Sequence, residues 1–304
     1  MVTTGQRPPS SRTDLPPLRP GADEIATGAL ADLAPESGWP RPVLLDAELL
    51  ILVTGGHGTA ELDFRALPCR PGTLLRVRPG QVLRCLGPQL DATVVRWGAG
   101  TLRGLDVDPD AVPTYRQLAG EDEDAVISEV TQLAVDADRH ARIPAAAPLL
   151  RHQLAVLLLR LSLLPVAEGP AQHRAETETF RRLCREVERG YQYTRRVEDY
   201  AARLGCSVRT LTRACLAVTG RSAKQVIDER VALQASRLLA ATDEPIARIG
   251  RWLGFPEPTN FGRFFTREVG VSPGAFRAAR ARPIPVRMVR PRPPADSPSP
   301  APQA

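Results

Sequence analysis

Apolar runs separated by glycine and proline fill residues 43–97. Residues 48–64 predict a strand, a glycine turn and a second strand, because two apolar runs flank a Gly-rich break. Residues 71–86 predict two shorter strands around a Pro-Gly turn, and residues 90–97 predict one more. Short strands at this spacing are typical of a small β-sandwich or barrel.

A helical pattern replaces the strands from residue 121 onward. Residues 121–140 and 148–164 carry apolar residues three or four positions apart, which predicts two amphipathic helices. The second helix has a leucine stripe, formed by Leu150, Leu154, Leu157, Leu158 and Leu161. This stripe is either core packed against the sheet or the seam of a dimer. The apolar run at 154–164 contains Arg160 and is too short to span a bilayer, so no membrane association is expected.

Composition divides the chain into domains. Residues 1–20 and 281–304 are rich in Pro, Arg and Ser and are predicted to be disordered tails. Between them we expect a sensor domain at 21–165, a linker at 166–175 and an all-helical domain at 176–280. The overall prediction is an α+β multidomain fold.

Positive charge is concentrated in the helical domain. The whole chain has a formal charge of +6, but residues 176–280 hold 19 basic and 12 acidic residues, a net charge of +7. Residues 1–175 have a net charge of −4, so the helical half is the part suited to a polyanionic partner. Arginine supplies every basic residue except Lys224, although a GC-rich coding sequence explains that excess more simply.

One sequence motif occurs twice in the helical domain, at residues 207–227 and 257–277. At an offset of fifty residues, matching types align at Leu211 and Phe261, Arg213 and Arg263, Gly220 and Gly270, Ser222 and Ser272, and Val226 and Phe276.

Each copy fits a helix-turn-helix unit, in which a small residue is followed four positions later by glycine and then by a polar-faced helix. The first copy offers Ala201 and Gly205, and the second offers Gly250 and Gly254. In the first copy we expect Ser207 to cap the second helix, and the apolar side chains to fill the space between the helices: Val197, Leu204, Val208, Leu211 and Leu216.

A connecting helix at 228–242 separates the two units. About fifteen helical residues span about 22 Å, and successive major grooves on one face of DNA lie about 34 Å apart. Two units held on one rigid helix therefore predict a longer DNA site than one unit reads.

The helical domain resembles the DNA-binding domain of the AraC/XylS family of bacterial transcription regulators. The family signature is matched by Leu253-Gly254-Phe255, Phe261, Arg263, Phe265, Gly270, Ser272-Pro273, Phe276 and Arg277. The first copy departs from the family at Cys215 and Leu216, where an aromatic and a basic residue are usual, and at Ala223, where proline is usual. The resemblance implies that promoter DNA and RNA polymerase are partners.

The second helix of each unit, the recognition helix, carries the expected DNA-binding residues. They are Ser207, Arg209, Thr210, Thr212 and Arg213 in the first unit, and Glu257, Thr259, Asn260, Arg263, Ser272 and Arg277 in the second. Arg pairs with guanine and Asn with adenine, while Thr and helix N-termini bind phosphate. Ser222, Ser272 and Arg277 fit helix caps or contacts to the DNA backbone better than base contacts. Some of the arginines also fit ordinary exposed side chains.

The strand region resembles the cupin-like sensor domain that many family members carry. His57 is the one histidine there and Glu61 is near it, so we expect no metal and no cofactor. An effector inside the barrel is possible, with Arg76, Arg78 and Arg84 as candidate anion contacts if they do not point outward. The resemblance also implies a homodimer formed through the helices at 121–164.

An enzyme is the competing interpretation, because some DNA-repair methyltransferases carry a similar module beside a reactive cysteine cluster. The five cysteines here, Cys69, Cys85, Cys184, Cys206 and Cys215, form no such cluster, so we predict no catalytic residues. The unpaired spacing and the polar N-terminus predict reduced thiols and a cytoplasmic, nucleoid-associated protein.

Overall fold

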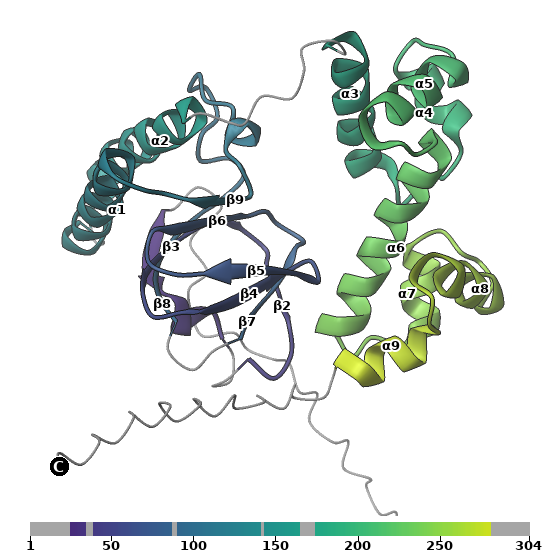
Figure 1. Cartoon of the computed structure of the whole chain (residues 1–304), viewed down its shortest axis with the longest axis horizontal. Coiled ribbons are helices and arrows are strands. Elements are labelled where there is room, and N and C mark those ends of the chain that lie inside the picture. The colour runs from purple at the N-terminus through teal and green to yellow at the C-terminus, as the bar shows by residue number, and fades with distance from the viewer. Residues whose placement is uncertain (1–24, 35–38, 87–89, 141–142, 165–173, 281–304) are drawn as a thin grey trace, which may run out of the picture.

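The computed structural model describes residues 25–34, 39–86, 90–140, 143–164 and 174–280 of the chain. Strands occupy its first part and helices its second, which confirms the α+β multidomain prediction (Figure 1). The two tails expected to be disordered lie outside the described residues, and so does the expected linker up to residue 173.

Two antiparallel sheets form the N-terminal domain, for which the name sensor domain is kept from the sequence expectation. The five-stranded sheet has the order β1-β8-β3-β6-β9, with β1 at Ala26–Ala29, β8 at Asp91–Trp97, β3 at Glu48–Gly55, β6 at Thr73–Val77 and β9 at Tyr115–Gln117. The four-stranded sheet has the order β2-β7-β4-β5, with β2 at Val43–Leu44, β7 at Val82–Leu86, β4 at Gly58–Leu62 and β5 at Arg65–Cys69. The sequence predicted β3, β4, β6, β7 and β8 and missed the others. Pro68 is tolerated in β5 because this strand is at the sheet edge.

The central strand β3 is buried on both faces, which explains its unbroken apolar sequence. Leu49, Ile51 and Val53 point into the core between the two sheets, while Leu50 and Leu52 point toward the helices on the other face. Side chains of both sheets fill the space between them, including Val77, Leu83, Cys85 and Val94. A strand covered on both sides loses the alternation that a half-exposed strand shows.

Helices α1 (Glu121–Arg139) and α2 (Ala147–Leu163) cover the outer face of the five-stranded sheet (Figure 1). Every leucine of the predicted stripe is buried there, beside Trp97 and Val95, so the stripe is core and the dimer-seam alternative for it is wrong. By length and composition alone residues 144–163 are long and apolar enough to cross a membrane, a test that the core helix of a soluble protein also passes. Packing against the sheet accounts for the buried leucine stripe of this segment.

The helical domain contains α3 (Arg174–Gly190), α4 (Val197–Arg203), α5 (Val208–Thr219), α6 (Ala223–Ala241), α7 (Ile246–Trp252), α8 (Pro258–Val269) and α9 (Pro273–Arg280). The connecting helix α6 starts five residues earlier than residue 228, where the sequence placed it. Ser222 and Gln225 form a capping box at its N-terminus, and this fixes the start. Its 19 residues give a length of about 28 Å.

The sensor domain touches the helical domain through the tip of the β4–β5 hairpin. The Asp63 carboxylate accepts two hydrogen bonds from the Arg237 guanidinium on α6, at 2.8 and 2.7 Å. Phe64 packs edge-on against Phe276 of α9, with ring centroids 5.5 Å apart. Arg280 lies over the Phe64 ring and pairs with Glu61. The contact is therefore both polar and aromatic.

The hairpin tip has an unusual backbone. Asp63 and Phe64 have φ values of 48° and 67°, so both residues of the two-residue turn are in the left-handed region. Such turns usually place glycine at the second position, and the sequence instead predicted strand as far as Phe64. A phenylalanine here carries a conformational cost, which its packing on Phe276 offsets.

We expect the Arg237→Ala variant to lose about 3 kcal/mol of unfolding free energy, because it leaves the Asp63 carboxylate buried without its main partner. The side chains of this pair are only 7% and 12% exposed. The matched control is Arg248→Ala, which breaks an exposed pair with Glu244 and should cost less than about 0.5 kcal/mol. Urea denaturation followed by circular dichroism measures both, and equal losses would contradict a stabilising role for the contact.

Candidate nucleic-acid interface

The two predicted helix-turn-helix units have the same turn geometry. Gly205 and Gly254 adopt φ values of 63° and 78°, which glycine accepts without the clash that a side chain introduces. The residue after each turn glycine donates its N–H to the carbonyl of the small residue before the turn. These bonds join Cys206 to Ala201 at 3.0 Å and Phe255 to Gly250 at 2.9 Å. The repeat seen in the sequence is therefore a repeat in three dimensions.

The two recognition helices begin differently but end in the same way. Ser207 caps α5 by accepting a hydrogen bond from the Thr210 N–H at 3.1 Å, as predicted. Helix α8 begins instead with Pro258 in its first turn, where no N–H is needed. Each helix ends at a left-handed glycine, Gly220 or Gly270. Local sequence thus fixes both ends of each recognition helix.

The phenylalanines of the second unit form its core. Phe261 and Phe265 are fully buried, and Phe255 and Phe264 are nearly so. Ring centroids of Phe255 and Phe261 lie 5.5 Å apart, and those of Phe261 and Phe265 lie 6.0 Å apart. Aromatic pairs at these separations stabilise the unit beyond simple area burial. The rings hold one face of α8 and leave the opposite face to solvent.

That solvent face carries the side chains expected to contact DNA. Arg209 and Arg213 of α5 are exposed, and so are Glu257, Thr259, Asn260 and Arg263 at α8. Thr210 and Thr212 are half-buried. In Figure 1, α5 and α8 both lie on the side of α6 away from the sheets, so the sensor domain does not cover them. The arrangement suits a long polyanion that contacts both helices at once.

Comparison with known proteins finds relatives of the helical domain. A family model described as a helix-turn-helix domain matches residues 200–279. The DNA-binding domain of AdpA, described as a global transcriptional factor in complex with a target DNA, is 32% identical over 33% of this chain and 90% of its own, with a TM-score of 0.30.

The chain belongs to the AraC-type helix-turn-helix family. An AraC-type regulator from Chromobacterium violaceum is 24% identical over 36% of this chain and 97% of its own, with a TM-score of 0.33. ToxT from Vibrio cholerae O395 is 12% identical over 84% of this chain and 97% of its own, with a TM-score of 0.42.

Two predicted DNA-binding residues have roles inside the AraC-type domain. Ser272 caps α9 by accepting a hydrogen bond from the Ala275 N–H at 3.2 Å. The Arg277 guanidinium donates to the carbonyls of Leu239 at 3.4 Å and Glu244 at 2.5 Å, so it joins α9 to the end of α6. The sequence motif could not separate these contacts from DNA binding, because both uses need the same polar residues near a helix end.

Two expected core residues of the first AraC-type unit are on its surface. Val208 is 38% exposed and Leu216 is 50% exposed, so the prediction that they fill the space between the helices is wrong. Ala214 and Cys215 are buried instead. Val208 is the first residue of α5 and lies outside the contact between the helices. Farther along α5, Cys215 rather than Leu216 is on the face that packs into the core.

The three arginines proposed as anion contacts in the sensor domain serve its structure. Arg76 is buried, pairs with Glu48 at 2.9 Å and also donates to the Pro109 carbonyl. Arg78 pairs with Asp110 at 3.2 Å. Arg84 is buried and donates to the Trp39 carbonyl at 3.1 Å. Burial lowers the pKa of Arg84, and the nearby Glu61 carboxylate opposes that shift.

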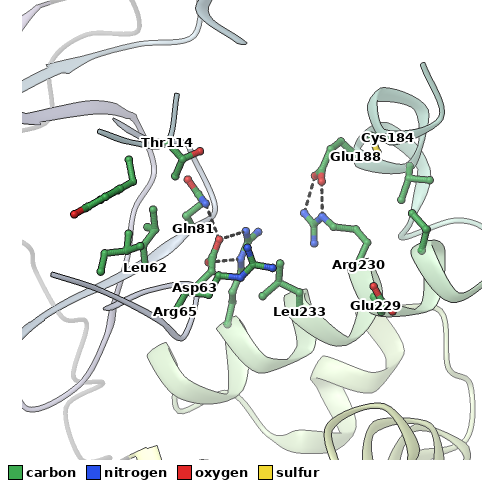
Figure 2. Close-up of a pocket in the computed structure, with 15 residues that line it drawn as sticks. Leu62, Asp63, Arg65, Gln81, Thr114, Cys184, Glu188, Glu229, Arg230 and Leu233 are labelled. Carbon is green, nitrogen blue, oxygen red and sulfur yellow. Dashed lines mark hydrogen bonds and ion pairs between the residues drawn. The ribbon is translucent and has the colours of Figure 1, made fainter. Parts of the chain in front are cut away.

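A cavity of about 660 Å³ lies between the sensor domain and the AraC-type domain (Figure 2). The hairpin side contributes Leu62, Asp63 and Arg65, and α3 and α6 contribute the opposite wall. Two ion pairs are at its borders. Asp63 pairs with Arg237, and the Glu188 carboxylate accepts two hydrogen bonds from Arg230 at 2.5 and 2.7 Å.

Helices α7 and α8 of the second unit cross closely at Gly250. Substitution of Gly250 is therefore expected to affect stability very differently from substitution of Gly262. A Cβ added at Gly250 would lie 3.0–3.2 Å from three atoms of the buried Phe261, whereas one added at Gly262 of α8 meets nothing within 4 Å. We therefore expect Gly250→Ala to destabilise the domain by about 1–3 kcal/mol. Gly262→Ala should stabilise it by up to about 1 kcal/mol, because alanine favours helix. Thermal unfolding of both variants tests this, and a stable Gly250→Ala protein would contradict the close crossing.

Proposed function

We propose that this chain is a sequence-specific transcription regulator in which α5 and α8 enter successive major grooves of promoter DNA. The observation that carries the proposal is the pair of exposed recognition helices joined by one connecting helix, α6. Its length of about 28 Å is close to the groove repeat of about 34 Å. One protomer then reads two patches of bases about one helical turn apart.

Individual side chains divide between base edges and the DNA backbone. Arg209, Arg213 and Arg263 have the fork geometry that pairs with guanine, and Asn260 has the donor and acceptor that pair with adenine. Thr259, at the N-terminus of α8, suits a phosphate, because the N–H groups there lack helical partners. Arg213 has a weak contact with Glu176 at 3.9 Å, which DNA can displace.

The sensor domain supplies dimerisation through the outer face of α2. With the leucine stripe buried, a second apolar row faces solvent at Leu149, Val156, Leu159 and Leu163, with exposed fractions from 42% to 83%. Three of these residues recur every seven positions, the spacing of a two-helix seam. The homodimer would place two DNA-binding domains on promoter DNA in the cytoplasm. RNA polymerase would be the neighbouring partner there.

An effector would bind in the cavity between the domains rather than inside the barrel. Apolar side chains of both sheets occupy the barrel interior, whereas the cavity volume of about 660 Å³ is typical of small-molecule sites. The cavity lies against both the hairpin and α6. A bound effector would therefore alter the contact between the two domains.

A repair enzyme with an activated cysteine is disfavoured by the environment of the thiols. Burial raises the pKa of Cys85 to about 12 and those of Cys184 and Cys215 to about 11. A nucleophilic cysteine needs the opposite shift, toward the thiolate.

The Arg213→Ala and Arg263→Ala variants test the base-reading role. Each should lose about 1–3 kcal/mol of discrimination between the selected site and a scrambled duplex. Arg185→Ala removes the same charge from an exposed position on α3 and should leave discrimination unchanged. Fluorescence anisotropy with both duplexes measures the ratio, and equal ratios in all three variants would remove these arginines from the reading set.

The dimer is tested by Val156→Glu, which places a charge on a side chain that is 52% exposed on α2. We expect this variant to be monomeric and the unmodified chain to be dimeric at micromolar concentration, because the charge must be desolvated in the seam. Leu216→Glu, at a site 50% exposed on α5, is the control and should remain dimeric. Light scattering gives the masses, and a dimeric Val156→Glu protein would place the seam elsewhere.

A further inference from the structure

The two helix-turn-helix units touch each other directly, apart from their shared helix α6. Residues 191–196, the loop before α4 in the first unit, reach the α7–α8 turn of the second. A Cβ at Gly254 would lie 3.3 Å from the Gln192 carbonyl, so the two backbones are close. The Arg195 guanidinium also reaches the Gly254 carbonyl at 3.5 Å.

Arg195 makes the most extensive of these contacts. Its guanidinium carbon lies 3.6 Å from the centroid of Phe255 and 5.7 Å from that of Phe264. These two rings are 4.8 Å apart and belong to the core on which α8 rests. A planar guanidinium stacked on an aromatic face is held by electrostatic attraction to the ring. Arg195 therefore contacts both the turn and the core that seat the second recognition helix.

The loop that carries Arg195 is itself fixed to the first unit. The Thr194 carbonyl accepts a hydrogen bond from the hydroxyl of the fully buried Tyr200 at 3.0 Å. The Thr194 hydroxyl bonds Asp199 of α4 and accepts from the Arg196 N–H at 3.1 Å. Movement of the first unit relative to the second would therefore have to break the Arg195 stack.

A charged cluster surrounds the same junction. Burial lowers the pKa of Arg195, while the Asp228 carboxylate of α6 opposes that shift and the Arg267 guanidinium adds to it. Arg267, on α8, contacts the same buried Asp228 at 3.3 Å and lies over Phe264. Asp228 thus places a negative charge of α6 near an arginine of each unit.

We infer that Arg195 is a positioning residue for DNA recognition, which fixes the orientation of α8 relative to α5 and so sets the spacing of the two DNA patches that one protomer accepts. The inference rests on the proposed function. Helix α6 alone leaves each unit attached along one line, and rotation about that line changes the relative direction of the recognition helices. The Arg195 stack provides a second point of attachment and prevents that rotation.

The neighbouring Arg196 supplies a matched control. Its side chain is 75% exposed and lies 3.7 Å from Glu198, on the surface of the first unit. Arg195→Ala and Arg196→Ala remove the same charge from adjacent positions, so any general electrostatic effect on DNA binding is common to both. Arg195→Lys keeps the charge but removes the planar group, and it tests the stack without emptying the site.

The experiment uses the full chain and a duplex that it selects from a random-sequence pool, together with duplexes in which one or two base pairs are inserted between the patches. The measured quantity is the ratio of affinities for the selected and the inserted duplexes. We expect Arg195→Ala to reduce that ratio by about threefold to tenfold, the strength of one partly desolvated cation–π contact. Arg195→Lys should reduce it to a smaller extent, and Arg196→Ala should leave it unchanged.

Two failures can be told apart. If the unmodified chain selects a two-patch site but Arg195→Ala and Arg195→Lys keep the same ratio as Arg196→Ala, the positioning role of Arg195 is wrong. If the unmodified chain selects a single short patch, the two-groove proposal itself is wrong. Circular dichroism of each variant, with the salt dependence of binding, separates a loss of fold from a loss of spacing preference.

Discussion

Burial of one broad face of helix α6 is the constraint on which the domain arrangement depends. Ala223, Ile227, Val231, Ala235 and Leu239 are almost inaccessible to solvent and form the centre of the helical core. The charged residues at or beside this face must be paired, because an unpaired buried charge is costly. Asp228 pairs with Lys224 within α6, and three pairings reach other elements: Asp228 with α8, Arg230 with α3, and Arg237 with the sensor hairpin. The charges of α6 therefore determine what packs around it.

This division of faces explains why both recognition helices are free for DNA. The sensor hairpin occupies the side of α6 near Arg237, and α5 and α8 lie on the other side (Figure 1). The hydrogen bonds and ring contacts of the hairpin tip involve α6 and α9. Helix α3, which precedes the first unit, faces the sensor domain across the cavity that Figure 2 shows. The sensor domain can thus hold the second unit without covering the surface proposed to contact DNA.

Sequence predicted the features that depend on neighbouring residues. The turn glycines, the Ser207 cap and the phenylalanine core of the second unit follow from spacing within about twenty residues, and the structure has all of them. The sequence could not predict contacts between distant segments. Asp63 and Arg237 are separated by 174 positions, and nothing local to either indicates the other. The same limit applies to Arg277, whose carbonyl partners come from the end of α6 and the segment that follows it.

Phe64 shows how a local exception reflects a distant contact. By turn chemistry alone its position favours glycine, so the residue is unexpected until its neighbour Phe276 is known. From there a continuous row of ring contacts runs through Phe265 and Phe261 to Phe255, where Arg195 of the first unit stacks on the far end. The aromatic core of the second unit is therefore held at one end by the sensor domain and at the other by the first unit. Because close-packed interiors transmit strain, this row of rings makes the packing beneath α8 depend directly on the position of the hairpin tip.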